Sequence, residues 1–206
     1  MTTLNITTWE TPCTKHYPLQ VSNGSASLEL DYYAPGLYRM EGIKGYDQYW
    51  TDQGIPVTCL LIEDKVWMVD DPLHWYAMGA YMEAAKPGHL LCAGLGLGLM
   101  LWHAKRMDKF TKITVVERNE DVAGLVWPLL PHDERFELVI DDYYDYHAAS
   151  LPDCILWDLA VGESKDNQVR ADIDRGIIMT QVLYPGVPGM VFGVRHKQNG
   201  FYVIGE

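Results

Sequence analysis

The sequence has no apolar run long enough to cross a lipid bilayer. Its longest uncharged apolar stretch, from Leu90 to Trp102, is interrupted by three glycines, whereas a transmembrane helix needs about 20 apolar residues. Residues 1–5 also lack the basic and apolar regions of a secretory signal peptide. These absences predict a cytoplasmic protein without a membrane partner.

Common signatures of metal sites and of activated nucleophiles are missing as well. The four cysteines form no C-x-x-C pair and the seven histidines show no H-x-x-x-H spacing, so no zinc site is expected. The chain contains neither a G-x-S-x-G elbow nor a Walker lysine. Three cysteines lie in predicted strands, where a reduced thiol packs as a small apolar group: Cys59, Cys92 and Cys154.

Basic residues are few. Sixteen lysines and arginines face 28 acidic residues, for a net charge of −12. Binding along a phosphate backbone needs a cationic surface, so no nucleic-acid partner is expected. The acidic balance suits a neutral or cationic small molecule, although an acidic surface also simply keeps a protein soluble. Apolar content of 48% in 206 residues predicts a folded chain with one substantial core.

A glycine-rich stretch runs from Leu90 to Met100. An apolar run enters glycines at positions 94, 96 and 98, and helix-forming residues follow. This pattern predicts a strand, a tight turn and a helix start. Glycine permits positive φ and close approach of a ligand to the backbone, and a helix start offers free N–H groups. The stretch is either a cradle for a nucleotide-like cofactor or a turn that only packs a helix on a sheet.

Acidic residues follow the next two predicted strands. The run 113–116 ends at Glu117, and the run 136–140 ends at Asp141 and Asp142. An acid about 20 residues beyond the glycines suits the hydroxyls of a ribose, and a further acid can accept a hydrogen bond from an adenine amino group. A dinucleotide motif would place its third glycine at position 99, which is Leu99.

The remaining pattern predicts an α/β fold in two parts. Strands at 89–93, 112–116, 136–140, 152–158, 189–194 and 201–204 alternate with helices at 98–107, 120–130 and 166–184, which indicates a mostly parallel sheet with an antiparallel edge hairpin. Residues 71–206 form this predicted domain. Residues 1–70 are expected to form a small N-terminal β subdomain or lid. Within it, residues 36–46 are expected to be a loop, and residues 36–52 to approach Asp158.

The G-x-G-x-G spacing with its following acids resembles motif I of the class I S-adenosylmethionine-dependent methyltransferases. The resemblance implies a Rossmann-like methyltransferase fold and S-adenosylmethionine as the cofactor. It implies that these residues bind it: Gly94, Leu95, Gly96, Gly98, Glu117, Arg118, Asp141 and Asp142.

The layout also resembles the spermidine synthases, in which a β-hairpin and a connecting helix precede the glycine-rich core. The segment 152–158 is similar to that family's strand with the catalytic acid, which places Asp158 at the catalytic position. However, that family carries an acid within its glycine motif, where this chain has Leu95 and Leu97, and the residues after Asp158 also differ. The resemblance therefore implies the layout rather than aminopropyl transfer.

The sequence thus favours a methyltransferase-like enzyme that acts on a small-molecule acceptor, which can be cationic. Asp158 is the candidate base or orienting group, or else a strand-end acid that caps the following loop. A divergent aminopropyltransferase and a non-catalytic nucleotide-binding module are the alternatives. The tyrosines at 143, 144 and 146 either attract a cation or pack. Whether the chain forms a homo-oligomer stays open.

Overall fold

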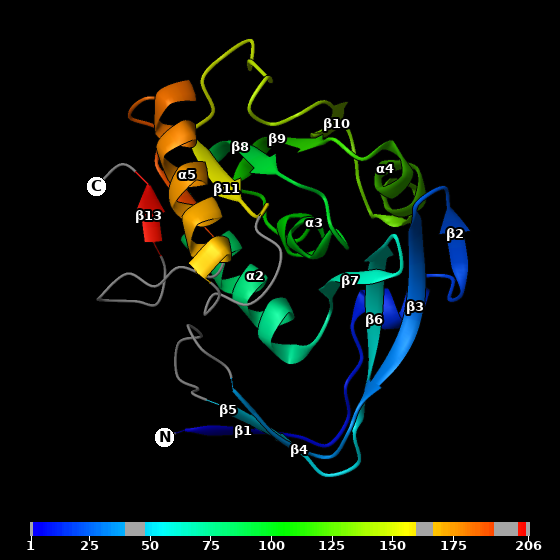
Figure 1. Cartoon of the computed structure of the whole chain (residues 1–206). Coiled ribbons are helices and arrows are strands. Elements are labelled where there is room, and N and C mark those ends of the chain that lie inside the picture. Colours follow the sequence, from blue (N-terminus) through cyan, green and yellow to red (C-terminus); the bar gives the residue numbers. More distant parts are fainter. Residues whose placement is uncertain (1, 40–47, 160–166, 192–201, 205–206) are drawn as a thin grey trace.

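A six-stranded sheet forms the centre of the protein. The structure, a computed structural model, describes residues 2–39, 48–159, 167–191 and 202–204 (Figure 1). The sheet has the order β10-β9-β8-β11-β12-β13, in which the first five strands are parallel and β13 is antiparallel. Its strands are β8 (Gly88–Ala93), β9 (Phe110–Glu117), β10 (Phe136–Ile140), β11 (Cys154–Trp157), β12 (Gly189–Val191) and β13 (Tyr202–Ile204). The predicted Rossmann-like α/β fold is confirmed.

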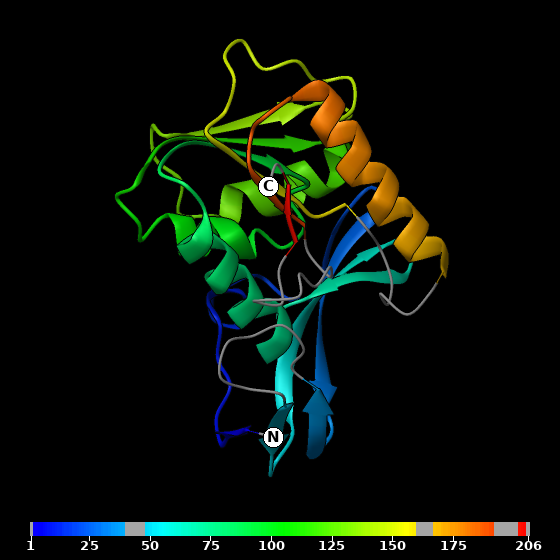
Figure 2. The same cartoon turned by 90° about the vertical axis from the view of Figure 1, so that its left-hand side faces the viewer.

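Helices cover both faces of this sheet. On one face lie α2 (Pro72–Ala84), α3 (Leu99–Ala104) and α4 (Glu120–Val126), which is followed by the short helix η1 (Trp127–Leu129). The other face is covered by α5 (Asn167–Leu183), which crosses the sheet in Figure 2. A separate hydrophobic core lies on each face of the sheet. Successive side chains of β8 point to opposite faces, so Leu90 and Cys92 pack into the core of the first face and Leu91 packs into the core of the second. Among the described residues, no helix combines the length and apolar composition that a membrane crossing needs.

Two helix starts follow directly from the sequence. Asp71 caps α2 by accepting a hydrogen bond from the backbone N–H of His74 at 2.9 Å, and Pro72 occupies the first turn. Asn119 caps α4 through its side-chain oxygen, which accepts from the N–H groups of Asp121 and Val122. The helix predicted from residue 120 therefore begins at the expected position.

The N-terminal residues form two further sheets. A four-stranded antiparallel sheet contains β2 (Val21–Asn23), β3 (Ala26–Tyr33), β6 (Ile55–Ile62) and β7 (Lys65–Val69), so the predicted hairpin before the core is present. A three-stranded sheet contains β1 (Thr3–Ile6), β5 (Gln48–Thr51) and β4 (Gly36–Arg39). Helix α1 (Pro12–His16) lies between β1 and β2 in the sequence.

One part of the N-terminal prediction is wrong. Residues 36–39 were expected in a loop but form β4, which pairs with β5. The Tyr38 ring stacks on Tyr49 at 5.0 Å and on Tyr33 at 5.5 Å between centroids, which favours the extended pairing over a loop. Residues 40–47 lie outside the described residues, so the expected approach of residues 36–52 to Asp158 stays a prediction.

The four-stranded sheet and the neighbouring helix α1 are held against the first face of the central sheet. The Asp121 carboxylate on α4 accepts hydrogen bonds from the N–H and the hydroxyl of Ser25 at 2.7 and 2.8 Å. The Tyr17 hydroxyl, just after α1, donates to the Leu97 carbonyl at 2.7 Å. Leu60 of β6 shares the core of that face. The N-terminal hairpin therefore lies beside the glycine-rich turn, as Figure 1 shows for β7 and α3.

Candidate functional site

The ends of four parallel strands bring the predicted site residues to one edge of the sheet. Backbone hydrogen bonds align these ends, from Asp158 N–H to the Ala93 carbonyl at 3.1 Å and from Asp141 N–H to the Glu117 carbonyl at 3.1 Å. Ligands of open α/β sheets bind at this edge. The residues that directly follow or end β8, β9, β10 and β11 there are Gly94, Glu117, Asp141 and Asp158.

The turn after β8 requires glycine. Gly94, Gly96 and Gly98 have φ values of +93°, +52° and +69°, a region that side chains rarely adopt. A Cβ on Gly94 would also lie 2.9 Å from the Asp158 carbonyl oxygen. The side chains of Leu95 and Leu97 are fully buried in the first core. Leu95 can therefore contribute only its backbone to the predicted site.

The Glu117 carboxylate joins the glycine turn to the start of α4. Its Oε2 accepts a hydrogen bond from the Leu95 N–H at 2.9 Å, and its Oε1 accepts from the Asn119 N–H at 2.8 Å. A carboxylate has about four lone-pair positions, so acceptor capacity remains after these two contacts. The carboxylate is held in place and can still accept from ribose hydroxyls.

Met68, on β7, also contacts the glycine turn, and the sequence analysis did not identify it. Its sulfur accepts a hydrogen bond from the Leu97 N–H at 3.2 Å and lies 2.4 Å from the position of a Cβ on Gly96. A thioether is a weak acceptor, so a stronger acceptor on a ligand can replace it at this N–H. No motif predicts this contact, because it joins a strand of the N-terminal hairpin to the central sheet.

A cleft of about 120 Å³ lies between the hairpin and the sheet edge. One wall is apolar and comes mainly from the hairpin, and the other contains the glycine turn and Glu117. The lining residues are Leu60, Ile62, Trp67, Val122, Gly96, Glu117, Arg118 and Asn119. Clefts that enclose a drug-sized ligand measure roughly 300–1,000 Å³, so this one suits a single ring-sized part. Its backbone and carboxylate groups fit a ribose ring, the sugar part of S-adenosylmethionine.

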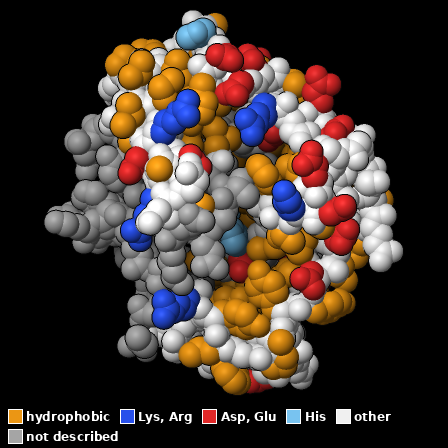
Figure 3. Space-filling view, in the orientation of Figure 1, with side chains coloured by type: hydrophobic (Ala, Val, Ile, Leu, Met, Phe, Trp, Pro, Cys, Tyr) orange, Lys and Arg blue, Asp and Glu red, His pale blue; other side chains and the backbone are white. Residues whose placement is uncertain are grey.

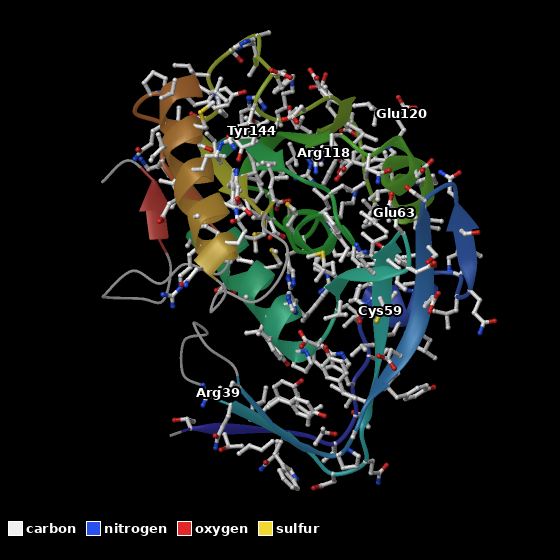
Figure 4. The ribbon with its side chains drawn as sticks, in the orientation of Figure 1. Arg39, Cys59, Glu63, Arg118, Glu120 and Tyr144 are labelled. Atoms are coloured by element: carbon white, nitrogen blue, oxygen red, sulfur yellow. The ribbon has the colours of Figure 1, made fainter. Side chains whose placement is uncertain are left out.

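The acids after β10 are partly engaged by their own loop. The Asp141 Oδ1 accepts from the Asp142 N–H at 2.9 Å, and the Asp142 Oδ1 accepts from the Tyr144 N–H at 2.9 Å. The second Asp142 oxygen lies 3.9 Å from Nη1 of Arg118, which extends from the end of β9 (Figure 4). Asp142 and Arg118 thus flank the sheet edge beyond Glu117.

Asp158 lies near an aspartate–histidine pair that the sequence analysis did not connect to it. Burial raises the pKa of Asp158 to about 6, and the nearby His74 opposes this rise. Nδ1 of His74 lies 2.6 Å from the Asp71 carboxylate. Burial lowers the pKa of His74, but the charge and hydrogen bond of Asp71, together with the charges of Asp158 and Asp70, outweigh it, so the pKa is raised. Figure 3 shows a hollow with a histidine and an acidic side chain, bordered by apolar side chains.

The tyrosines after β10 pack against neighbouring elements. The Tyr143 hydroxyl lies 3.2 Å from the Thr180 hydroxyl on α5, and the Trp157 N–H donates to the Tyr144 hydroxyl at 3.2 Å. The Tyr146 carbonyl accepts from the Tyr184 hydroxyl at 2.9 Å. These contacts favour packing over a cation site.

The cysteines also lie in packed surroundings. All four are buried and unpaired with one another, and burial raises the pKa of the Cys154 thiol to about 11. A buried thiol in this state is a poor nucleophile. In the part of the chain that the structure describes, no cluster of three histidine, cysteine or acidic side chains could hold a metal ion.

No protein-family profile and no curated protein matches the sequence. Solved structures do match. N-methyltransferase NodS from Bradyrhizobium japonicum, also solved with S-adenosylhomocysteine, is 17% identical over 59% of this chain and 68% of its own, with a TM-score of 0.42. The 23S rRNA methyltransferase ErmE is 17% identical over 56% of this chain and 44% of its own (TM-score 0.44).

A probable spermidine synthase from Corynebacterium glutamicum is 17% identical over 84% of this chain and 63% of its own, with a TM-score of 0.49. The chain therefore spans less than two thirds of ErmE and of the spermidine synthase. At these identities the likeness concerns the fold. In fold, this chain is similar to methyltransferases and to a probable spermidine synthase.

Proposed function

We propose that this protein is an S-adenosylmethionine-dependent methyltransferase that acts on a small-molecule acceptor. The observation that carries the proposal is the Glu117 carboxylate, fixed by the N–H groups of Leu95 and Asn119 beside Gly96 in the cleft. A fixed acceptor beside a backbone without a side chain suits a ribose that lies across a glycine turn.

Several residues at the edge have specific roles in this proposal. Glu117 accepts hydrogen bonds from the two ribose hydroxyls, and Gly96 allows the ligand to approach the backbone. Arg118, which lines the cleft, and the neighbouring Asp142 border the base. The bound cofactor supplies an activated methyl group, so the protein has only to align the acceptor and exclude water.

Asp158 is the proposed base for the acceptor. Burial raises its pKa to about 6, so at neutral pH it is mostly a carboxylate and still a competent proton acceptor, as general-base catalysis favours. His74, held by Asp71, limits the rise in this pKa. The net charge of −12 supports a neutral or cationic small molecule over RNA as the acceptor.

The cofactor proposal is tested by calorimetry with S-adenosylhomocysteine. The wild-type protein is expected to bind it, and Glu117→Gln to weaken binding at least tenfold, since a hydrogen bond to a charged group contributes about 1.5–3 kcal/mol. Glu137→Gln is the matched control, because Glu137 lies on β10 in an exposed ion pair with Lys112 at 2.8 Å. Binding of NAD without binding of S-adenosylhomocysteine would contradict the proposal.

The same protein samples test aminopropyl transfer and the proposed role of Glu117 in nucleotide binding. Turnover of putrescine with decarboxylated S-adenosylmethionine would favour aminopropyl transfer. We expect none, because the two positions that would carry the glycine-motif acids are the fully buried Leu95 and Leu97. Binding of S-adenosylhomocysteine that is unchanged in Glu117→Gln would instead indicate a different mode of nucleotide binding.

A further inference from the structure

Strand β7 contains an extra residue relative to its partner β6. Leu60 pairs with Met68 and the next residue, Leu61, pairs with Val66, so Trp67 has no partner on β6. This arrangement is a β-bulge, which turns side chains away from the regular alternation and is frequent beside active sites. The bulge lies a few residues after the β6–β7 turn, where Figure 4 labels Glu63 beside α4.

The bulge places the consecutive side chains of Trp67 and Met68 on the side of β7 that faces the glycine turn. Met68 accepts a hydrogen bond from the Leu97 N–H, and Trp67 lines the cleft together with Gly96. In a regular strand, neighbouring side chains point to opposite faces. Without the bulge, Trp67 and Met68 would point to opposite faces of β7.

The cleft around Trp67 has one apolar and one polar side. Leu60 and Ile62 adjoin the indole on the hairpin side, and the Glu117 carboxylate faces the cleft from the sheet edge. Trp67 remains 40% exposed, so its ring is available to a ligand. An aromatic face binds a planar base by stacking, and a carboxylate binds hydroxyl groups. A nucleoside offers both groups in one molecule.

We infer that Trp67 is a further binding residue, which stacks on the purine base of the ligand whose ribose is held by Glu117. The β6–β7 hairpin is then part of the cofactor site and not only a neighbouring sheet. The inference rests on the proposed function, and it adds a residue from outside the glycine-rich core. It also predicts that adenosine alone binds, whereas ribose 5-phosphate, which lacks the base, does not.

Tryptophan fluorescence and calorimetry test this inference with S-adenosylhomocysteine and adenosine as probes. Both ligands are expected to quench the wild-type emission, and Trp67→Phe is expected to lose most of the quenching. Trp50→Phe is the matched control, because Trp50 is 41% exposed on the three-stranded sheet, close to the 40% of Trp67. This variant keeps the quenching.

Affinity separates a ligand contact from a structural role. Trp67→Ala is expected to weaken adenosine binding about tenfold or more, the typical effect of one lost base–aromatic stack. Trp67→Phe retains a ring and stays within a few-fold of the wild-type affinity. Thermal unfolding of each variant identifies any loss of fold, and Trp67→Phe keeps the test decisive if Trp67→Ala does not fold.

The outcomes distinguish the inference from the proposed function. Unchanged quenching in Trp67→Phe, or unchanged affinity in a folded Trp67→Ala, would overturn the role of Trp67 and leave the methyltransferase proposal standing. Adenosine binding that quenches Trp67, without binding of S-adenosylhomocysteine, would support the nucleoside cleft and refute the methyltransferase proposal. A wild-type protein that binds neither ligand would overturn both.

Discussion

Replacement of Asp158 by asparagine changes how the stability of the protein depends on pH. Burial raises the pKa of this carboxyl from 3.8 to about 6, so the folded state favours its neutral form. The associated stability is fully present below about pH 4 and is lost as the pH rises through about 6. About two pH units correspond to about 3 kcal/mol. Asparagine stays neutral and avoids this loss.

The measurement is urea unfolding of the wild type and of Asp158→Asn at several values between pH 3.5 and 8. The free energy of unfolding of the variant, relative to the wild type, should rise by up to about 3 kcal/mol across this range. Most of the rise falls between about pH 4 and 6. Asp145→Asn, at an exposed position of the loop after β10, controls for the loss of a surface charge.

His74→Gln, measured in the same series, separates the contribution of the neighbouring imidazole. Because His74 lowers the pKa of Asp158, its loss should shift the pH-dependent region of an otherwise wild-type protein upward. Two results would refute the assigned environment of Asp158. The difference in the free energy of unfolding between wild type and Asp158→Asn would stay constant with pH, or it would increasingly favour the wild type as the pH rises.

Three further substitutions are expected to lower the free energy of unfolding in urea. Gly176→Ala would place a Cβ 2.2 Å from the ring of the buried Trp157 and should cost about 1–3 kcal/mol; a neutral result would mean that this ring can shift. Asn119→Ala removes the cap of α4 and should cost about 1 kcal/mol, whereas Asn119→Ser should restore most of it. Tyr17→Phe leaves the Leu97 carbonyl without its 2.7 Å donor and should cost about 1–3 kcal/mol; unchanged stability would contradict this role.

The order and type of the central elements could be predicted because their signals are local. Buried parallel strands appear as short apolar runs, such as 90–93 and 113–116. Three glycines at alternate positions mark a turn with positive φ, and all three have it. Glu117 could be placed at the sheet edge because parallel strands end together. The sheet-edge half of the proposed site therefore follows from the sequence.

The hairpin half of the proposed site could not be predicted. The residues 65–69 alternate no more clearly than other strands, and nothing local indicates that Trp67 is the extra residue of a bulge. The pairing of His74 with Asp71 is local, but its proximity to Asp158 depends on how α2 packs on the sheet. The expected loop at 36–39 became a strand because Tyr38 found ring partners on β3 and β5.

The sequence by itself determined the α/β order, the glycine turn and the acids at the strand ends, since each depends on neighbours within a few residues. Only the tertiary structure decided which side chains cover that edge. Tyr143 became a packing residue because α5 presents Thr180 to its hydroxyl. Met68 contacts the glycine turn and Trp67 lines the cleft because Leu60 and the residues around it pack the hairpin into the same core as β8. Contacts between segments far apart in the chain depend on how whole elements pack, and no local pattern encodes that.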